Sequence, residues 1–171
     1  RVVAVASSQQ KVDLALSRGA DAGVVYPAGP LDLAAAKAFK DALRASCGPQ
    51  GANVVCDPVG GDYAEAALRT LAYRGRYLVI GFTAGIPRIP LNLVLLKAGQ
   101  LIGVLWGSFA RGDAQANRRN VAELMALYEH GLIRPFISAR FPLERAPDAL
   151  AMLAERRALG KVVVHCSAAR A

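Results

Sequence analysis

Two serines and a lysine near the start of the chain have the types and the spacing to bind an anion. The apolar run Val2–Ala6 is followed by Ser7 and Ser8, and Lys11 comes three residues later. A helix is predicted to begin here, which places Lys11 in its first turn, where the helix dipole disfavours a cation by up to about 1 kcal/mol. A phosphate held by the serine hydroxyls, the backbone amides of that turn and Lys11 would reverse this cost.

The same residues have an explanation that needs no ligand. Ser7 and Gln10 match the S-x-x-Q capping box, in which each side chain bonds the other residue's backbone N–H. Lys11 would then point into water. The spacing alone leaves both interpretations open, and a capping serine can also face a ligand.

The elements that must position these residues alternate between strand and helix. Strands are predicted over residues 2–6, 22–26, 52–56, 75–80 and 100–106, with helices over 7–18, 31–47, 63–72 and 92–97 between them. The strands are continuous runs of Val, Ile, Leu and Ala, which is typical of a parallel sheet covered on both faces. The pattern predicts a doubly wound α/β fold.

The character of the sequence changes after Trp106, where "GSFARGDAQANRR" is polar. Apolar residues at helical spacing follow, and we expect them to be core: Val121, Leu124, Met125, Tyr128 and Leu132. A strand in "IRPFISARFPL", a helix over 146–154 and a strand in "KVVVHC" complete the chain. We therefore expect two parts, residues 1–106 and residues 107–171.

Composition limits the classes of function. The 171 residues carry a net charge of +8 that is spread along the chain, so a solvated basic surface is favoured over a nucleic-acid partner. No apolar run is long enough to span a bilayer, so no membrane partner is expected. Cys47, Cys56 and Cys166 have no metal-ligand spacing, which argues against zinc and favours a reducing cytoplasm. His130 and His165 are isolated, and no catalytic nucleophile, acid–base pair or triad is found.

Four stretches together resemble the quinone oxidoreductase branch of the medium-chain dehydrogenase/reductase superfamily. They are "VVAVASSQQKVDLALSRGAD", "NVVCDPVGGDYAEAALRTLAYRGRYLVIGFTAG", "IPLNLVLLKAGQLIGVLWGS" and "GKVVV", and the resemblance runs from Val2 to Val164. It implies a Rossmann-like, alcohol dehydrogenase-like fold. It also implies an enzyme that uses NADPH to reduce quinones and other electron-poor alkenes without a catalytic zinc.

The resemblance further implies an NADP(H) site. Ser7, Ser8 and Lys11 match the family's 2′-phosphate site, where an NAD-selecting carboxylate would otherwise stand. The remaining matches follow later strands: Tyr26 near the adenine; Pro58, Val59 and Gly60 near a ribose; Gly81, Phe82, Thr83, Leu105 and Trp106 near the nicotinamide; and Lys161, near the cofactor in some members.

Several of these positions also have purely structural explanations. Tyr26 would be an ordinary strand-end aromatic, and Asp57 and Pro58 would be turn formers ahead of a helix. Trp106 would be a core or interface aromatic. Lys161 would simply follow a helix stop and begin a strand.

Two parts of the family pattern are missing. The glycine-rich phosphate loop and its strand would precede Val2, and so would the substrate-binding domain. That strand is central in the order 3-2-1-4-5-6, and each orphaned backbone group in a buried gap costs about 1–3 kcal/mol. We expect the strand to come from a separate fragment or a swapped partner, or the gap to close. The start at Arg1 rather than Met fits a processed end or a piece of a longer chain.

The sequence therefore predicts a fragment of a zinc-independent NADPH-dependent oxidoreductase, itself inactive. The alternatives are an enoyl-thioester reductase of the same superfamily and a non-catalytic dinucleotide- or nucleic-acid-binding protein. We expect a cytoplasmic homodimer that pairs through an edge strand over Leu101–Trp106. Apolar surface in "FISARFPL" and "KVVV" is expected to be exposed.

Overall fold

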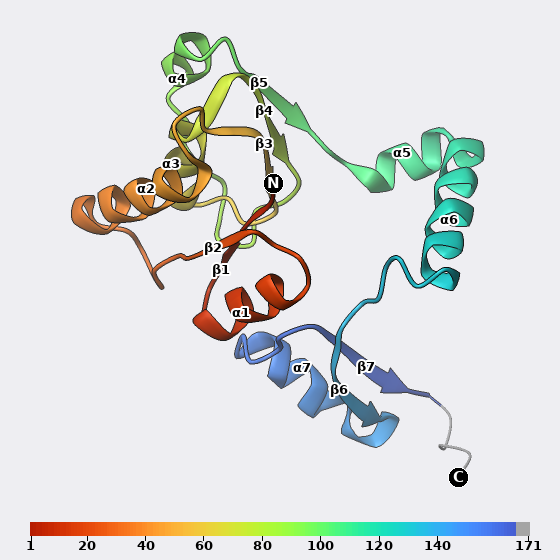
Figure 1. The fold of residues 1–171 in the computed structure, drawn as a ribbon. Helices are drawn as coiled ribbons and strands as arrows, with labels where there is room; N and C mark the ends of the chain where they lie inside the picture. Colours follow the sequence, from red (N-terminus) through yellow and green to blue (C-terminus); the bar gives the residue numbers. More distant parts are fainter. Residues whose placement is uncertain (167–171) are drawn as a thin grey trace. The chain divides into compact units, whose positions relative to one another are not determined.

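The chain forms two compact units, the first over Arg1–Trp106 and the second beginning at Gly107. The structure is a computed structural model that describes residues 1–166 (Figure 1). The boundary falls where the sequence becomes polar. Each unit has its own strands and helices.

The first unit alternates strand and helix along its length. Its elements are β1 (Val3–Ala6), α1 (Gln9–Ser17), β2 (Ala22–Val25), α2 (Leu33–Cys47), β3 (Ala52–Asp57), α3 (Tyr63–Arg69), β4 (Leu71–Val79), α4 (Leu91–Leu96) and β5 (Gln100–Gly103). All strand pairs in this unit are parallel. The predicted α/β fold with parallel strands is confirmed.

The strands of the first unit form two separate sheets, β1-β2 and β3-β4-β5 (Figure 1). A cavity of about 760 Å³ is lined by both β1 and β3, including Val5 and Val54. These two side chains are 44% and 40% exposed, so the facing strands are open to solvent. Closure of the gap, one of the three outcomes expected from the sequence, is therefore not what the structure adopts.

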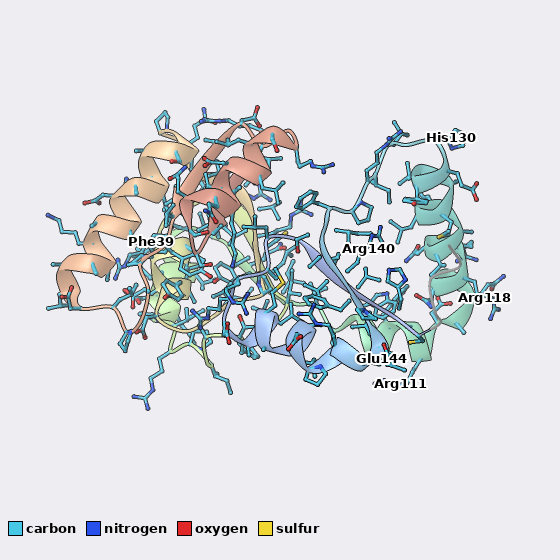
Figure 2. The ribbon with its side chains drawn as sticks, turned by 90° about the horizontal axis from the view of Figure 1, so that it is seen from below. Phe39, Arg111, Arg118, His130, Arg140 and Glu144 are labelled. Atoms are coloured by element: carbon cyan, nitrogen blue, oxygen red, sulfur yellow. The ribbon has the colours of Figure 1, made fainter. Side chains whose placement is uncertain are left out.

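Two apolar clusters hold the first unit together. One cluster contains Ala64, Leu68, Leu71, Tyr77 and Leu93, from α3, β4 and α4. The other contains Val24, Phe39, Leu43 and Ala66, from β2, α2 and α3, and Figure 2 marks Phe39 on α2. Because α3 contributes to both clusters, it packs against residues associated with each of the two sheets.

The element boundaries differ most from those expected around residue 70 and after residue 103. The helix predicted over 63–72 ends at Arg69, and β4 begins at Leu71 rather than at residue 75, since Leu71 and Ala72 are buried in the sheet. The strand predicted over 100–106 ends at Gly103 because its partner β4 ends at Val79. Trp106 instead begins a helix, α5 (Trp106–Gly112). The predicted edge strand is therefore shorter than Leu101–Trp106.

The second unit contains one long helix and a small parallel sheet. Its elements are α6 (Ala114–Glu129), β6 (Ile137–Pro142), a 3-10 turn η1 (Leu143–Arg145), α7 (Ala146–Ala154) and β7 (Lys161–His165). β6 and β7 pair in parallel, and α7 packs against both. Phe136 and Ile137 are about one-third exposed, at 38% and 36%, whereas Val162, Val163 and Val164 are half-buried.

The apolar stripe on α6 is not core in this structure, and the prediction that it would be is wrong. The stripe residues are between 46% and 73% exposed, and α6 has no buried residue: Val121, Leu124, Met125 and Tyr128 lie on α6, and Leu132 follows it. Side chains project from α6 along its length, with Arg118 and His130 marked in Figure 2. The stripe is amphipathic in sequence, but no other described element of the second unit packs along it.

Candidate functional site

The carboxyl ends of the parallel strands carry most of the residues predicted to bind a cofactor. Ser7 follows β1 and Tyr26 follows β2, and the Tyr26 N–H donates to the Ala6 oxygen over 2.9 Å, which extends the pairing by one step. In the other sheet the register pairs Asp57 with Val79, so the loops after β3 and β4 leave the sheet side by side. Ligands of open parallel sheets bind beyond such ends.

Lys11 lies against both serines at the start of α1. Its Nζ donates to the Ser7 Oγ over 3.1 Å, and its backbone N–H donates to the Ser8 Oγ over 3.4 Å. Ser8 is the cap residue of α1, so the capping box expected from Ser7 and Gln10 is wrong. The first turn of α1 carries no acidic residue. A cation, two hydroxyls and a helix N-terminus therefore meet here, and this donor set suits a phosphate.

Tyr26 belongs to a cluster of aromatic rings. Its ring centroid lies 4.7 Å from that of Tyr63, which in turn lies 5.9 Å from that of Phe39. The Tyr63 hydroxyl donates to the Pro27 oxygen over 2.8 Å, which fixes the start of α3 against the turn after β2. Tyr26 thus has a packing role in the fold, and its contact with an adenine stays a prediction.

The loops after β3 and β4 are joined by their backbones. Several backbone hydrogen bonds connect them, including Ala84 N–H to Val59 O at 2.8 Å, Gly61 N–H to Gly85 O at 2.7 Å and Thr83 N–H to Pro58 O at 3.4 Å. Gly60 and Gly61 have φ of +68° and +57°, and a Cβ would lie 2.7 Å and 2.6 Å from a backbone oxygen of the other loop. Only glycine permits this close approach. We call residues 57–61 and 80–85 the loop pair.

Asp57 accepts three hydrogen bonds at the start of the loop pair. Its Oδ1 accepts from the N–H groups of Val59 and Gly60 over 2.8 and 3.0 Å. Its Oδ2 accepts from the Tyr77 hydroxyl over 2.5 Å. Burial, and next the bond to Asp57, raise the pKa of Tyr77 far above its ordinary range, so this hydroxyl remains a donor. Sequence reasoning treated Asp57 as a turn former; its position at a strand end, two and three residues before Val59 and Gly60, was the available signal.

The residues predicted to face a nicotinamide follow β4 and β5. A Cβ on Gly81 would lie 3.2 Å from the Pro58 oxygen, which is tighter than ordinary contact. Phe82 is 47% exposed, and Leu105 and Trp106, which follow β5, are 72% and 63% exposed. These apolar side chains are accessible at the ends of neighbouring strands. Their contact with a nicotinamide stays a prediction.

Lys161 lies in the second unit and begins β7. Its backbone N–H donates to the Phe136 oxygen over 2.7 Å, and its side chain is exposed. The structural explanation, a residue that starts a strand after a helix stop, accounts for this position. Its assignment to the cofactor site stays a prediction.

The described residues do not fit a metal site or a membrane span. Over residues 1–166, no group of three or more His, Cys, Asp or Glu side chains is placed to hold a metal ion, and Cys47, Cys56 and Cys166 are free thiols. No helix in this part of the chain combines the length and apolar character needed to cross a membrane. The His130 Nδ1 lies 2.6 Å from the Ala126 oxygen at the end of α6.

Comparison with known proteins identifies the family. A family model described as zinc-binding dehydrogenase matches residues 19–164. The chain therefore belongs to the zinc-binding dehydrogenase family, and the resemblance to the quinone oxidoreductase branch of the medium-chain superfamily is confirmed.

Three relatives illustrate the range of the match. Quinone oxidoreductase-like protein 2 of Rattus norvegicus is 38% identical over 165 residues, which cover 96% of this chain and 45% of the relative. A mycobacterial protein solved in complex with NADPH has a TM-score of 0.78 at 28% identity, over 96% of this chain and 48% of that one. Mycoketide-CoA synthase of Mycobacterium tuberculosis is 33% identical over 128 residues, 74% of this chain and 3% of that protein. The chain thus spans about half the length of the quinone oxidoreductase-like relative.

Proposed function

We propose that this chain is the cofactor-binding part of an NADP(H)-dependent oxidoreductase that reduces quinones or other electron-poor alkenes. The observation that carries the proposal is the contact of Lys11 with the Ser7 hydroxyl at the carboxyl end of β1. In dinucleotide-binding folds this strand end lies beside the adenosine ribose, where a carboxylate favours NAD and a cation favours the 2′-phosphate of NADP. The NADPH complex of a structural relative supports the same choice.

The geometry supports a different role for each part of the proposed site. Ser7, Ser8 and Lys11 would hold the 2′-phosphate, and the loop pair would support the ribose and nicotinamide end. The cofactor itself supplies the hydride. The chain's own residues orient it and, through Phe82 and Trp106, offer apolar surface at the reacting end. The groups that bind the acceptor would come from outside this chain.

A second candidate is an enoyl-thioester reductase of the same superfamily, which would share the fold and the cofactor. The match to mycoketide-CoA synthase favours it, since that protein's name indicates work on thioester-linked chains. The two candidates differ only in the acceptor. Turnover of 1,4-benzoquinone against crotonyl-CoA by the full-length protein, with NADPH in excess, separates them.

The decisive experiment concerns cofactor choice. In the full-length protein, Lys11→Glu should weaken NADPH binding by about 30-fold or more while NADH changes little, because a charge-assisted bond to phosphate is replaced by repulsion. Fluorescence titration with each nucleotide gives the two dissociation constants. Lys37→Glu is the matched control, since Lys37 lies exposed on α2 and carries the same charge change. An equal loss for both nucleotides would remove the phosphate assignment. Absence of binding to either nucleotide would refute the proposed function.

A further inference from the structure

The Asp57 side chain stabilises the first loop of the loop pair, residues 57–61, by accepting hydrogen bonds from its backbone. Both carboxylate oxygens are used: Oδ1 bridges the N–H groups of Val59 and Gly60, and Oδ2 meets the Tyr77 hydroxyl. The two hydrogen bonds from Val59 and Gly60 fix a tight turn in the backbone directly after β3. A carboxylate is suited to this place because it accepts at both oxygens and donates at neither.

Tyr77 fixes the position of that carboxylate. Its ring is 1% exposed and belongs to the apolar cluster that contains Leu68, Leu71 and Leu93. This packing restricts the ring, and with it the hydroxyl group, to one position. Since Tyr77 lies on β4 and Asp57 ends β3, their bond ties the start of the loop to the core through a second strand.

The first loop in turn supports the second. The Asp57 backbone oxygen accepts from the Ile80 N–H over 2.9 Å, and the Val59 oxygen accepts from the Ala84 N–H over 2.8 Å. The Asp57 side chain has no bond to residues 80–85 in the described contacts. It reaches them only through the backbone that it holds.

We propose that Asp57 is a positioning residue of the cofactor site, which keeps the loop pair in one arrangement before the cofactor binds. This inference rests on the proposed function for the identity of the ligand. Asp57 acts through Val59 and Gly60 and does not itself need to touch the nucleotide. The Tyr77 hydroxyl fixes the orientation of the carboxylate through its hydrogen bond to Oδ2. A preformed loop pair lowers the ordering cost of binding.

The test uses the full-length protein with Asp57→Asn and Tyr77→Phe. Tyr73→Phe is the matched control, because Tyr73 lies on the same strand and is 74% exposed. Hydrogen exchange of the free protein, read by mass spectrometry, should accelerate in residues 57–61 and also in residues 80–85, with no change in α2. Both variants should raise the dissociation constants of NADPH and NADH by the same factor of about ten, and leave the KM of the acceptor unchanged.

Each outcome bears on the inference. Unchanged exchange in residues 80–85, or unchanged nucleotide affinity in a protein that does bind nucleotide, would overturn it. Exchange that rises equally across α2 and β4 would assign Asp57 to global stability and overturn it as well. If the wild type binds neither nucleotide, the proposed function fails and so does the cofactor half of this inference. The exchange measurement then still decides whether Asp57 holds the two loops together.

Discussion

The ammonium group of Lys97 donates a hydrogen bond to the Leu71 backbone oxygen over 2.5 Å, and the Lys97 backbone oxygen accepts from the Arg74 N–H over 2.7 Å. Lys97, the residue that follows α4, thus contacts Leu71 and Arg74 in the stretch where β4 shifts register against β3. Arg74 lies in the left-handed region at φ +59°, which costs a non-glycine residue on the order of 1 kcal/mol. Lys97 therefore stabilises this irregular stretch through both its side chain and its backbone.

Replacing Lys97 by Met should lower the free energy of unfolding by about 1 kcal/mol, because the Leu71 oxygen loses its charged donor while the aliphatic stem is kept. The loss is limited because burial, and next the charge of Arg44, lower the pKa of Lys97 and so disfavour its charged form. Thermal unfolding of the full-length protein measures the change. Lys37→Met removes an exposed lysine of α2 and should leave the midpoint unchanged; equal shifts in the two variants would contradict the role given to Lys97.

Alkaline pH should destabilise the fold through Tyr77. Its pKa is raised in the folded state, first by burial and then by Asp57, so the folded state keeps a proton that the unfolded state releases above the ordinary value of 10.0. The unfolded state then binds fewer protons, and the free energy of unfolding falls as pH rises above that value. Below it, the hydroxyl is protonated in both states and contributes no pH dependence.

Thermal midpoints of the full-length protein, measured from about pH 9 to about pH 11, test this titration. The midpoint of the wild type should fall more steeply with pH than that of Tyr77→Phe, and Tyr73→Phe should follow the wild type. The lowered pKa of Lys97 acts in the opposite direction, but it is common to all three proteins and cancels in the comparison. Parallel curves for Tyr77→Phe and wild type would contradict the assignment.

The loop pair should tolerate no side chain at Gly61. At φ +57°, a Cβ there would lie 2.6 Å from the Ala84 oxygen, so Gly61→Ala must open the two loops or strain both. We expect a loss of about 1–3 kcal/mol of stability and weaker binding of both nucleotides. Gly112→Ala is the control, since a Cβ at Gly112 meets open space and its helix favours alanine. A stable Gly61→Ala protein with unchanged affinity would show that the close approach is not needed.

The sequence predicted the alternation of strands and helices well because most strands are short apolar runs and the helices between them have clear stops. It also predicted that Ser7, Pro58 and Gly81 follow strand ends, where ligands of parallel sheets bind. It failed at α6, whose amphipathic stripe meets the usual pattern of a packed helix but is not covered by another described element of the second unit.

The cap of α1 is a detail that the sequence alone could not predict. Ser7 and Ser8 are both good cap residues, and only the backbone geometry decides that Ser8 caps while Ser7 meets Lys11. The bond that anchors Asp57 could not be foreseen either, because its donor, Tyr77, lies twenty residues away on the next strand. Local spacing identifies a turn, whereas the anchor of that turn is a tertiary contact.

A strand supplied from outside this chain should fill the cavity between β1 and β3. These two strands line the cavity but belong to separate sheets, and their side chains Val5 and Val54 are exposed. In the chain of 171 residues alone, the backbone amides of residues 3–6 and 52–57 that face the cavity should exchange rapidly. In the full-length protein, which the half-length match to relatives leads us to expect, they should be protected by ladder hydrogen bonds. β4 is the internal control, since it pairs with β3 on one side and β5 on the other in either form. Equal exchange of β1 and β3 in the two proteins, with β4 protected in both, would show that no strand enters the cavity.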